Sequence, residues 1–365
     1  MTDGTRRRPL GSARFGRRRF LQLTAAGIGA VAVAPAARPH VAHAQFEELY
    51  RLARAEGQLN LQGGGPAAPF LAAARQFMAA FPGVTVNFAP SDRGALDRQL
   101  ASGNVEVDLV IFQGWQYFDG WKHANALLPF MPAGWDQIPA GYKDPDGTHV
   151  GIRVGALGFA YSTDRVPPDK VPETAQDFLD PQLAGLCITT YPQADELALY
   201  RYDTIVQKYG WEFVERLLAN RPQFLRGHLG VAQEISAGRA GVSFDATLET
   251  ALAAQAAGAP IATRIPEAEG MPIWAQPSGI FRAAPHPNAA RLYLSWLLSP
   301  EPQAQLGPGQ WSVRADVPPP AGFRPIAEYN VLTGYRDFVL DEERLEELQA
   351  RYLEAIGPVR GGQVS

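Results

Sequence analysis

The chain has 365 residues, which is long for a single hydrophobic core, and this length predicts two domains. Its formal net charge is −4, but without the eight arginines and one aspartate of residues 1–44 the remainder carries 25 basic and 36 acidic residues, a net charge of −11. An acidic chain lacks the basic surface that a phosphate backbone requires, so we expect no nucleic-acid partner. The single cysteine, Cys187, excludes a disulfide framework.

The first 44 residues predict an export signal. Arginines at positions 17–19 precede an uncharged apolar stretch at 21–34, and residues 42–44 read Ala-His-Ala, a small-residue cleavage pattern. The adjacent arginines predict the twin-arginine translocase as the export partner. The apolar stretch is too short to span a bilayer core of about 30 Å, and no cysteine follows it to carry a lipid anchor. A basic tail on a cytosolic protein is the alternative, but it leaves the apolar stretch unexplained. We therefore expect a soluble periplasmic protein.

Strands and helices alternate in the first part of the mature chain. Apolar periodicity predicts a helix from 46 that ends at Gly57, a strand at 58–62, a helix at 66–81, a strand at 84–88, a helix from about 91 and a strand at 107–112. This alternation is typical of a parallel α/β sheet, in which ligands bind at the carboxyl ends of the strands.

A second α/β block follows a strand at 151–161, whose three glycines suit a segment that crosses between domains. The pattern then predicts strands at 187–190 and 241–244, a helical region at 198–218, a helix at 248–257, and extended segments at 260–265 and 274–282 that return to the first domain. A helix after His286 and a final amphipathic helix around 345–353 complete the chain.

Residues 63–68 (GGGPAA) lie between a strand and a helix and formally fit the dinucleotide pattern G-x-G-x-x-A. With Asp92 at the end of the next strand, a dinucleotide site is one interpretation. The two others are a different ligand at the helix N-terminus, where backbone amides are accessible, and a plain loop.

Catalytic motifs are absent from the sequence. It contains no G-x-S-x-G, H-E-x-x-H, C-x-x-C or P-loop pattern, and no two histidines of the mature chain are spaced like a metal-binding pair. Cys187 lies in an apolar strand and is expected to be a small core side chain, and His286, between two prolines, is expected to be a surface cap. We therefore expect a protein that is not an enzyme and has no resident cofactor.

Aromatic and charged residues near the predicted strand ends point to ligand binding. Trp115 follows the third strand and Trp274 lies on a returning segment, and such rings stack on organic ligands or cations. Packing of the core is the alternative for Trp115. Arg153 is a candidate clamp for a carboxylate or phosphonate, with a salt bridge as its alternative. Asp245 follows a strand of the second block and faces either the ligand or a helix amide.

Several segments together match one family. They include residues 81–86 (FPGVTV), 142–147 (YKDPDG) and 157–163 (LGFAYST), and the most specific stretch is 277–301, which contains PSGI, APHPNAA and WLLSPE in that order. The chain resembles the type II periplasmic solute-binding proteins of ABC importers, in the branch that includes ferric-iron, polyamine and aminoethylphosphonate binders. The resemblance runs from about residue 46 to 325.

This resemblance implies an α/β fold of two Rossmann-like lobes joined by two crossover strands. Lobe one would comprise residues 45–155 plus 270–365, and lobe two residues 156–269. A protein of this kind closes over a small-molecule ligand by a hinge motion and presents the closed form to the membrane permease and ATPase of an importer. We expect a monomer.

The resemblance also bears on the ligand. Iron binders of the family hold the metal with adjacent tyrosines after the strand that is 241–244 here, where this chain has Asp245 followed by Ala246 and Thr247. A small organic or zwitterionic solute is therefore implied. The alternatives are a ferric-iron-binding member of the same family and a twin-arginine-exported enzyme with a cofactor. The implied ligand-binding residues are Gly64, Gly65, Ser91, Gln113, Trp115, Arg153, Tyr191, Asp245 and Trp274.

Overall fold

The computed structural model describes residues 38–360, with side chains described from residue 46. The arginines and the apolar stretch of the predicted export signal lie outside the described residues. The predicted cleavage site at 42–44 falls within helix α2 (Arg38–Glu56). Within the described part of the chain, no helix combines the length and the apolar character that crossing a membrane requires.

The chain divides into two compact units. The first extends to Leu109 and includes the later segment Ala283–Trp296, and the second comprises Val110–Arg282 and the chain from Leu297 onward. These bounds differ from those of the lobes that the resemblance implies, so the lobe assignment stays a prediction.

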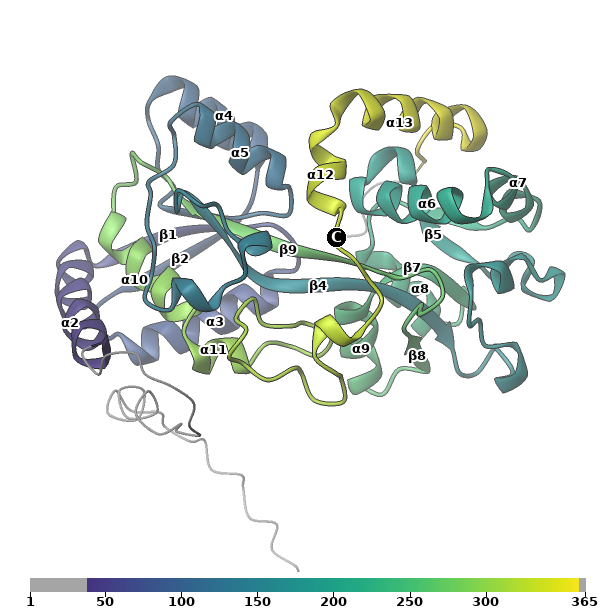
Figure 1. Ribbon diagram of the computed structural model, residues 1–365, viewed down its shortest axis with the longest axis horizontal. Coiled ribbons are helices and arrows are strands. Elements are labelled where there is room, and N and C mark those ends of the chain that lie inside the picture. Colours follow the sequence, from purple (N-terminus) through teal and green to yellow (C-terminus); the bar gives the residue numbers. More distant parts are fainter. Residues whose placement is uncertain (1–37, 361–365) are drawn as a thin grey trace, which may run out of the picture. The chain divides into compact units, whose positions relative to one another are not determined.

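The first unit has the alternating order that the sequence predicts (Figure 1). After α2 come β1 (Gln58–Gly63), α3 (Ala67–Ala80), β2 (Thr85–Pro90), α4 (Arg93–Ser102) and the beginning of β3 (Leu109–Ile111), and the later segment supplies α10 (Pro287–Leu297). Strands β1 and β2 pair in parallel. The ring of Phe77 on α3 lies 5.0 Å from Tyr293 and 5.5 Å from Trp296 on α10, so the apolar faces of these two helices form an aromatic core.

Glu56 at the end of α2 fixes the beginning of α10. Its Oε1 accepts hydrogen bonds from the backbone N–H of Asn288 (3.1 Å) and from that residue's Nδ2 (2.6 Å), and its Oε2 accepts from the N–H of Ala289 (2.7 Å). The carboxylate therefore occupies the positive end of the helix dipole and satisfies two amides that have no partner inside the helix.

We expect Glu56→Gln to lower the free energy of unfolding by about 1–2 kcal/mol, because the amide keeps one acceptor but loses the charge that favours the helix terminus. Urea denaturation of the purified protein measures the change. Glu48→Gln is the matched control on the same helix. Its carboxylate pairs with Arg51 on an exposed surface, so its loss should change stability much less than the loss of the Glu56 carboxylate. Equal effects in the two variants would contradict the role of Glu56.

The second unit is built around a mixed sheet whose strands run in the order β3-β9-β4-β7. The long strand β4 (His149–Ser162) is antiparallel to β9 (Met271–Ile280), to β7 (Val242–Thr247) and to β8 (Ile261–Arg264). Strand β10 (Val331–Leu332) pairs in parallel with β9, and β5 (Ile188–Thr190) pairs in parallel with β6 (Gln223–Leu225). The helices are α5 (Trp115–His123), α6 (Glu196–Tyr209), α7 (Glu212–Ala219), α8 (Leu229–Ser236), α9 (Leu248–Ala256), α11 (Pro300–Ala304), α12 (Tyr335–Leu340) and α13 (Glu342–Ile356).

The helical region predicted at 198–218 is present in the structure. It is two helices, α6 and α7, because Gly210 between them has a φ of 74°, a left-handed value at which an α-helix ends. The strand predicted at 107–112 is shorter in the structure, where only Leu109–Ile111 form β3.

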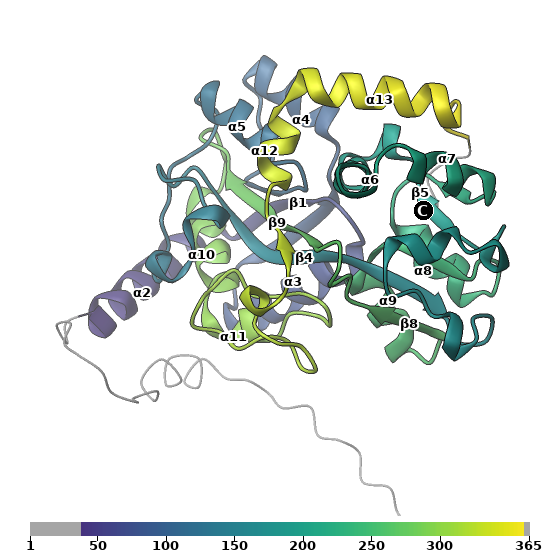
Figure 2. The same ribbon diagram turned by 45° about the vertical axis from the view of Figure 1, so that its right-hand side comes forward.

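The two C-terminal helices pack on α6, as Figures 1 and 2 show from two directions. Tyr352 of α13 is fully buried, with its ring 5.2 Å from Tyr202 of α6. Arg344 of α13 donates to the carboxylate of Asp203 at 2.7 Å. The C-terminal segment is therefore an integral part of the second unit.

Candidate functional site

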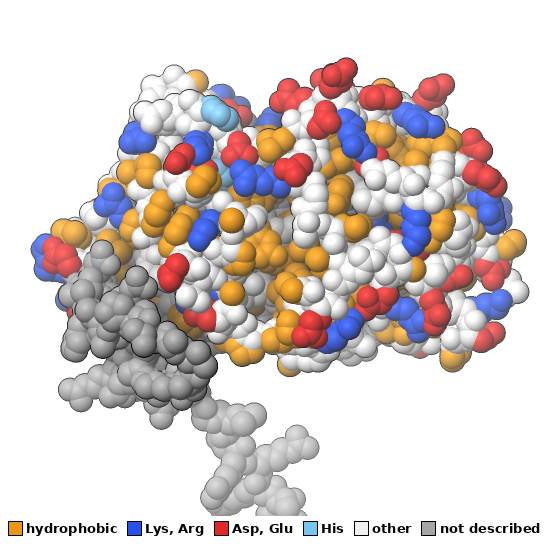
Figure 3. Space-filling model, viewed as in Figure 1, with side chains coloured by type: hydrophobic (Ala, Val, Ile, Leu, Met, Phe, Trp, Pro, Cys, Tyr) orange, Lys and Arg blue, Asp and Glu red, His pale blue; other side chains and the backbone are white. Residues whose placement is uncertain are grey.

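A pocket of about 730 Å³ opens in the second unit. Aromatic side chains from distant parts of the sequence line it, together with several prolines of the segment after Trp311. Hydrophobic side chains gather in the middle of one face of the molecule, over the region where β4 and β9 run (Figure 3). The aromatic residues that line the pocket are Trp115, Tyr142, Trp274, Trp311 and Tyr335.

Trp115, the first residue of α5, is fixed on both its edge and its face. Its indole N–H donates to the carbonyl of Ala275 on β9 at 2.7 Å, and the guanidinium of Arg336 on α12 lies 4.7 Å from its ring centre. Only 2 % of the residue is exposed. The structure shows the core packing of this tryptophan, which also lines the pocket, and its contact with a ligand stays a prediction.

Trp274 on β9 lies opposite Gly155 on β4. A Cβ atom on Gly155 would come within 2.5 Å of Cζ2 of this indole, so the glycine is what gives the ring its space. Trp311 reaches the same region through a backbone bridge to Val154, and its indole N–H donates to the carbonyl of Arg324 at 3.1 Å. The pocket therefore has three indole walls anchored in the sheet and in the segment after α11.

The charged side chains of the pocket are paired with opposite charges. Arg314 donates to both carboxylate oxygens of Asp316, at 2.8 and 2.7 Å, and Arg336 donates to both carboxylate oxygens of Asp119, at 3.1 and 3.2 Å. Arg314 donates from Nε and Nη2, the two-nitrogen geometry that guanidinium groups favour, whereas Arg336 donates from Nη2 to both oxygens. The pocket thus contains balanced ion pairs among apolar walls.

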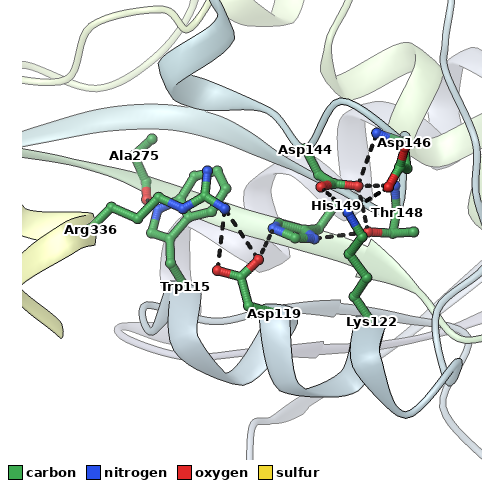
Figure 4. A network of polar contacts seen from close by, with 9 residues as sticks. All are labelled: Trp115, Asp119, Lys122, Asp144, Asp146, Thr148, His149, Ala275 and Arg336. Atoms are coloured by element: carbon green, nitrogen blue, oxygen red, sulfur yellow. Dashed lines mark hydrogen bonds and ion pairs between the residues drawn. The ribbon is translucent and has the colours of Figure 1, made fainter. Parts of the chain in front are cut away.

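A polar network extends from Arg336 along α5 and the start of β4 (Figure 4). His149 lies between Asp119, whose Oδ1 is 3.4 Å from Nε2, and the hydroxyl of Thr148, which is 3.0 Å from Nδ1. The Thr148 hydroxyl donates to Asp144 at 2.8 Å, and Lys122 bonds to the same carboxylate at 2.6 Å. The network ties α5 to α12 and to the turn before β4.

His149 is neutral in the folded protein. Burial is the largest influence on its pKa and lowers it to about 4, although the carboxylates of Asp119 and Asp144 act in the opposite direction. The unfolded chain binds a proton at His149 as the pH falls through about 6.5, while the folded protein binds it only near pH 4. Stability therefore falls as the pH drops through this window.

We expect the pH change from about 6.5 to 4 to cost about 3 kcal/mol of stability through His149 alone. Denaturation midpoints measured across that range in the native protein and in His149→Gln test this contribution. Since glutamine does not titrate, the variant should lose less stability on acidification. Identical pH profiles in both proteins would show that His149 is not the group responsible.

Arg153 is engaged inside the protein and does not line the pocket. Its Nε donates to Gln276 at 2.6 Å and its Nη1 to Glu249 at 2.6 Å, and Gln310 donates to the same Glu249 oxygen at 2.6 Å. Of the two interpretations of Arg153, the structure shows the internal salt bridge.

Asp245 lies within β7, which extends beyond the strand predicted at 241–244, and Tyr191 follows β5. Asp245 is fully buried and accepts hydrogen bonds from the hydroxyl and backbone groups of Thr189, Thr190 and Ser243 at 2.9 Å. Tyr191 stacks on Phe224 with ring centres 5.1 Å apart. Neither residue lines the aromatic pocket.

His228 lies beside Asp195 and the buried Asp245, and it was not among the residues predicted from the sequence. Burial opposes its charge, but the carboxylates of Asp195, 3.4 Å from Nδ1, and of Asp245, 3.9 Å from Nε2, outweigh burial and raise its pKa. A sequence gives no signal for this, because Asp195 and His228 are brought together only by the fold.

Each of the remaining implied residues follows one of the first three strands along the chain. Gly64 and Gly65 follow β1, and the N–H of Ser91 donates to the carbonyl of Gly63 at 2.9 Å. Gln113 is exposed after β3. Asp92, the acidic partner required by the dinucleotide interpretation, caps α4 instead, accepting from the N–H of Ala95 at 3.0 Å. Of the nine implied residues, the pocket brings together Trp115 and Trp274.

Cys187 is a buried free thiol, and burial raises its pKa, so it is not a thiolate nucleophile. Across the described residues, no three His, Cys, Asp or Glu side chains are grouped so as to hold a metal ion.

A family model described as bacterial extracellular solute-binding protein matches residues 60–304, which is more than half of the chain. The chain belongs to this family. No protein with a curated description matches it in sequence. Membership confirms that the protein is a solute binder and not an enzyme.

Solved structures share the fold of this solute-binding protein. AfuA from Actinobacillus pleuropneumoniae, with exogenous fructose-6-phosphate bound, has a TM-score of 0.69 at 19% identity, covering 83% of this chain and 99% of its own. The substrate binding protein of an ABC transporter from Agrobacterium tumefaciens has a TM-score of 0.70 at 16% identity, covering 82% and 94%. Iron-bound HitA from Pseudomonas aeruginosa has a TM-score of 0.65 at 15% identity, covering 81% and 99%. At these identities the similarity shows the fold alone, and it confirms the predicted type II periplasmic binding protein fold.

Several pocket residues of the solute-binding protein were not predicted from the sequence. Trp311, Tyr335 and Arg336 come from the segment after α11, which carries neither a strand pattern nor a known motif. Trp311 reaches the site through its backbone bridge to Val154 on β4, and Arg336 through its ion pair with Asp119 on α5.

Proposed function

We propose that this solute-binding protein is the extracytoplasmic component of an ABC importer, capturing a small organic solute in the aromatic pocket and delivering it to a membrane permease. Family membership supports a binding function, and one of the structural neighbours is the substrate binding protein of an ABC transporter. The observation that carries the proposal is the pocket formed by Trp115, Trp274 and Trp311, whose volume of about 730 Å³ is in the range of small-molecule sites.

The structural neighbours differ in what they bind, since one is described with fructose-6-phosphate and another with iron. A ferric ion requires several hard oxygen ligands. Here Asp245 lies within β7, and its oxygens already accept from Thr189, Thr190 and Ser243. The donor set therefore supports an organic solute over a metal ion.

A thermal-shift screen of the mature protein over amines, zwitterions, phosphonates, carboxylates, neutral organic solutes and ferric salts tests this function. A ligand present at 100 times its dissociation constant should stabilise the protein by about 2.7 kcal/mol. Mass spectrometry after incubation should then show the solute bound and chemically unchanged. Stabilisation by ferric salts alone, or conversion of the solute to a product, would refute the proposal.

We also propose that the twin-arginine translocase exports this protein to the periplasm, on the evidence of the arginines at 17–19 and the apolar stretch that follows. Replacing Arg17 and Arg18 by lysine keeps the charge but removes the arginine pair. Cell fractionation should then find the precursor retained in the cytoplasm, whereas normal export of the double variant would count against this route.

A further inference from the structure

Resting on the proposed function, we infer that the solute of this pocket is uncharged and carries a planar or apolar ring. The inference starts from the charges. The charged side chains that line the pocket within the described structure are Arg314, Asp316 and Arg336. Arg314 and Asp316 neutralise each other, and Arg336 is neutralised by Asp119 just outside the pocket.

No charge in the pocket is left for a charged solute to neutralise. An anion would have to compete with Asp119 for Arg336 or with Asp316 for Arg314, and a cation would have to compete with an arginine for a carboxylate. Each exchange leaves a partly buried charge without its partner, which is costly in a site with apolar walls. His149 adds no positive charge behind Asp119, because burial keeps its pKa near 4.

The aromatic walls of the pocket favour a solute that contains a ring. Indole faces stack well on flat apolar groups, and the pocket contains three of the seven tryptophans of the chain. The indole N–H groups of Trp115 and Trp311 are both used by backbone carbonyls. These two tryptophans therefore offer ring surface and no hydrogen-bond donor to the solute.

The polar side-chain groups that stay available in the pocket are neutral, namely the indole N–H of Trp274 and several hydroxyls. The hydroxyls of Tyr142, Thr333 and Tyr335 belong to pocket residues and have no hydrogen-bond partner among the described residues. Burial raises the pKa of both tyrosines, so their hydroxyls stay protonated at physiological pH. These few groups suit one or two polar substituents on a ring, but they are too few for a sugar, because each buried sugar hydroxyl without a partner would cost free energy.

The test measures binding to the mature protein by calorimetry, with intrinsic tryptophan fluorescence as a second readout. Indole and benzyl alcohol are the uncharged ring probes. Benzoate and benzylamine carry a charge on a ring of similar size, and glucose, fructose-6-phosphate and ferric citrate represent the other solute classes. We expect the uncharged rings to bind at least tenfold more tightly than any of the others.

One variant localises the binding without removing a buried group. Ala327 is an exposed residue at the pocket, and Ala327→Trp should fill it and weaken ring binding at least tenfold. Ala350→Trp, the same substitution at an exposed position of α13 outside the pocket, is the matched control and should leave affinity unchanged.

The outcomes separate this inference from the proposed function. Tighter binding of benzoate, benzylamine, glucose, fructose-6-phosphate or ferric citrate than of the neutral rings would overturn the solute class. If the tighter ligand is one of the organic probes, the protein would still be the solute-binding component that we propose. Ring binding that Ala327→Trp leaves intact would overturn the pocket as the site. Failure of every probe and of the wider solute screen to bind would overturn both.

Discussion

Trp274→Ala is expected to weaken solute binding about 30-fold, which corresponds to about 2 kcal/mol and is typical of a buried aromatic anchor at a binding site. Trp274 combines two properties that make this effect large. It is only 6 % exposed, so its ring is held in place, and it lines the pocket beside Ala275, the acceptor of the Trp115 indole. Calorimetry with the best solute from the screen measures the loss.

Trp274→Phe should lie between the native protein and the alanine variant, because it keeps an aromatic face with less area. Trp211→Ala is the matched control in the same unit. Trp211 packs on Tyr352 and Arg351, away from the pocket, so its removal should lower stability but leave affinity unchanged. All variants need a folded circular-dichroism spectrum at the temperature of the binding measurement. Equal affinities of the Trp274 and Trp211 variants would show that Trp274 does not contact the solute.

Asp108→Ala is expected to lower the free energy of unfolding by about 3–5 kcal/mol. Asp108 is fully buried just before β3, and its carboxylate accepts from the backbone N–H of Asn60 and of His286, both at 2.6 Å. It also lies 2.9 Å from Nδ1 of His286. Alanine would leave two partly buried amides, one in β1 and one in the turn before α10, without partners.

Urea denaturation of Asp108→Ala and Asp97→Ala gives a direct comparison within the first unit. Asp97 lies on α4 with about half of its side chain exposed, where loss of a surface charge pair changes stability by less than about 1 kcal/mol. A loss of similar size in both variants would mean that the Asp108 contacts contribute little. The contacts also correct the interpretation of His286 as a surface cap, since its backbone and its ring both bind the buried carboxylate.

Much of the fold follows from local pattern. The alternation of strands and helices in the first unit is predicted because β1, β2 and α3 each carry a periodic apolar face and end at glycine or proline. The break at Gly210 was missed because the apolar period continues across it. The short strand β10 and helix α12 were missed because neither is long enough to show a period.

The site was less predictable than the fold. The aromatic residues chosen near strand ends, Trp115 and Trp274, both line the pocket, and their role in ligand binding stays a prediction. Charged residues were a poor signal. Arg153 has the chemistry of an anion clamp, but its charge is used by Glu249, 96 residues away in sequence, and no local pattern reveals that partner.

The close approach of Gly155 to Trp274 means that the residue at position 155 influences the size of the pocket. A methyl group at position 155 would press on the indole and force it to move, although residue 155 itself is not among those that line the pocket. Selectivity among solutes can therefore drift, or be engineered, through a glycine on the strand next to the indole. Homologues with the same three tryptophans but a larger residue at position 155 should be treated as a separate specificity group. The solute found for one group should not be assigned to the other.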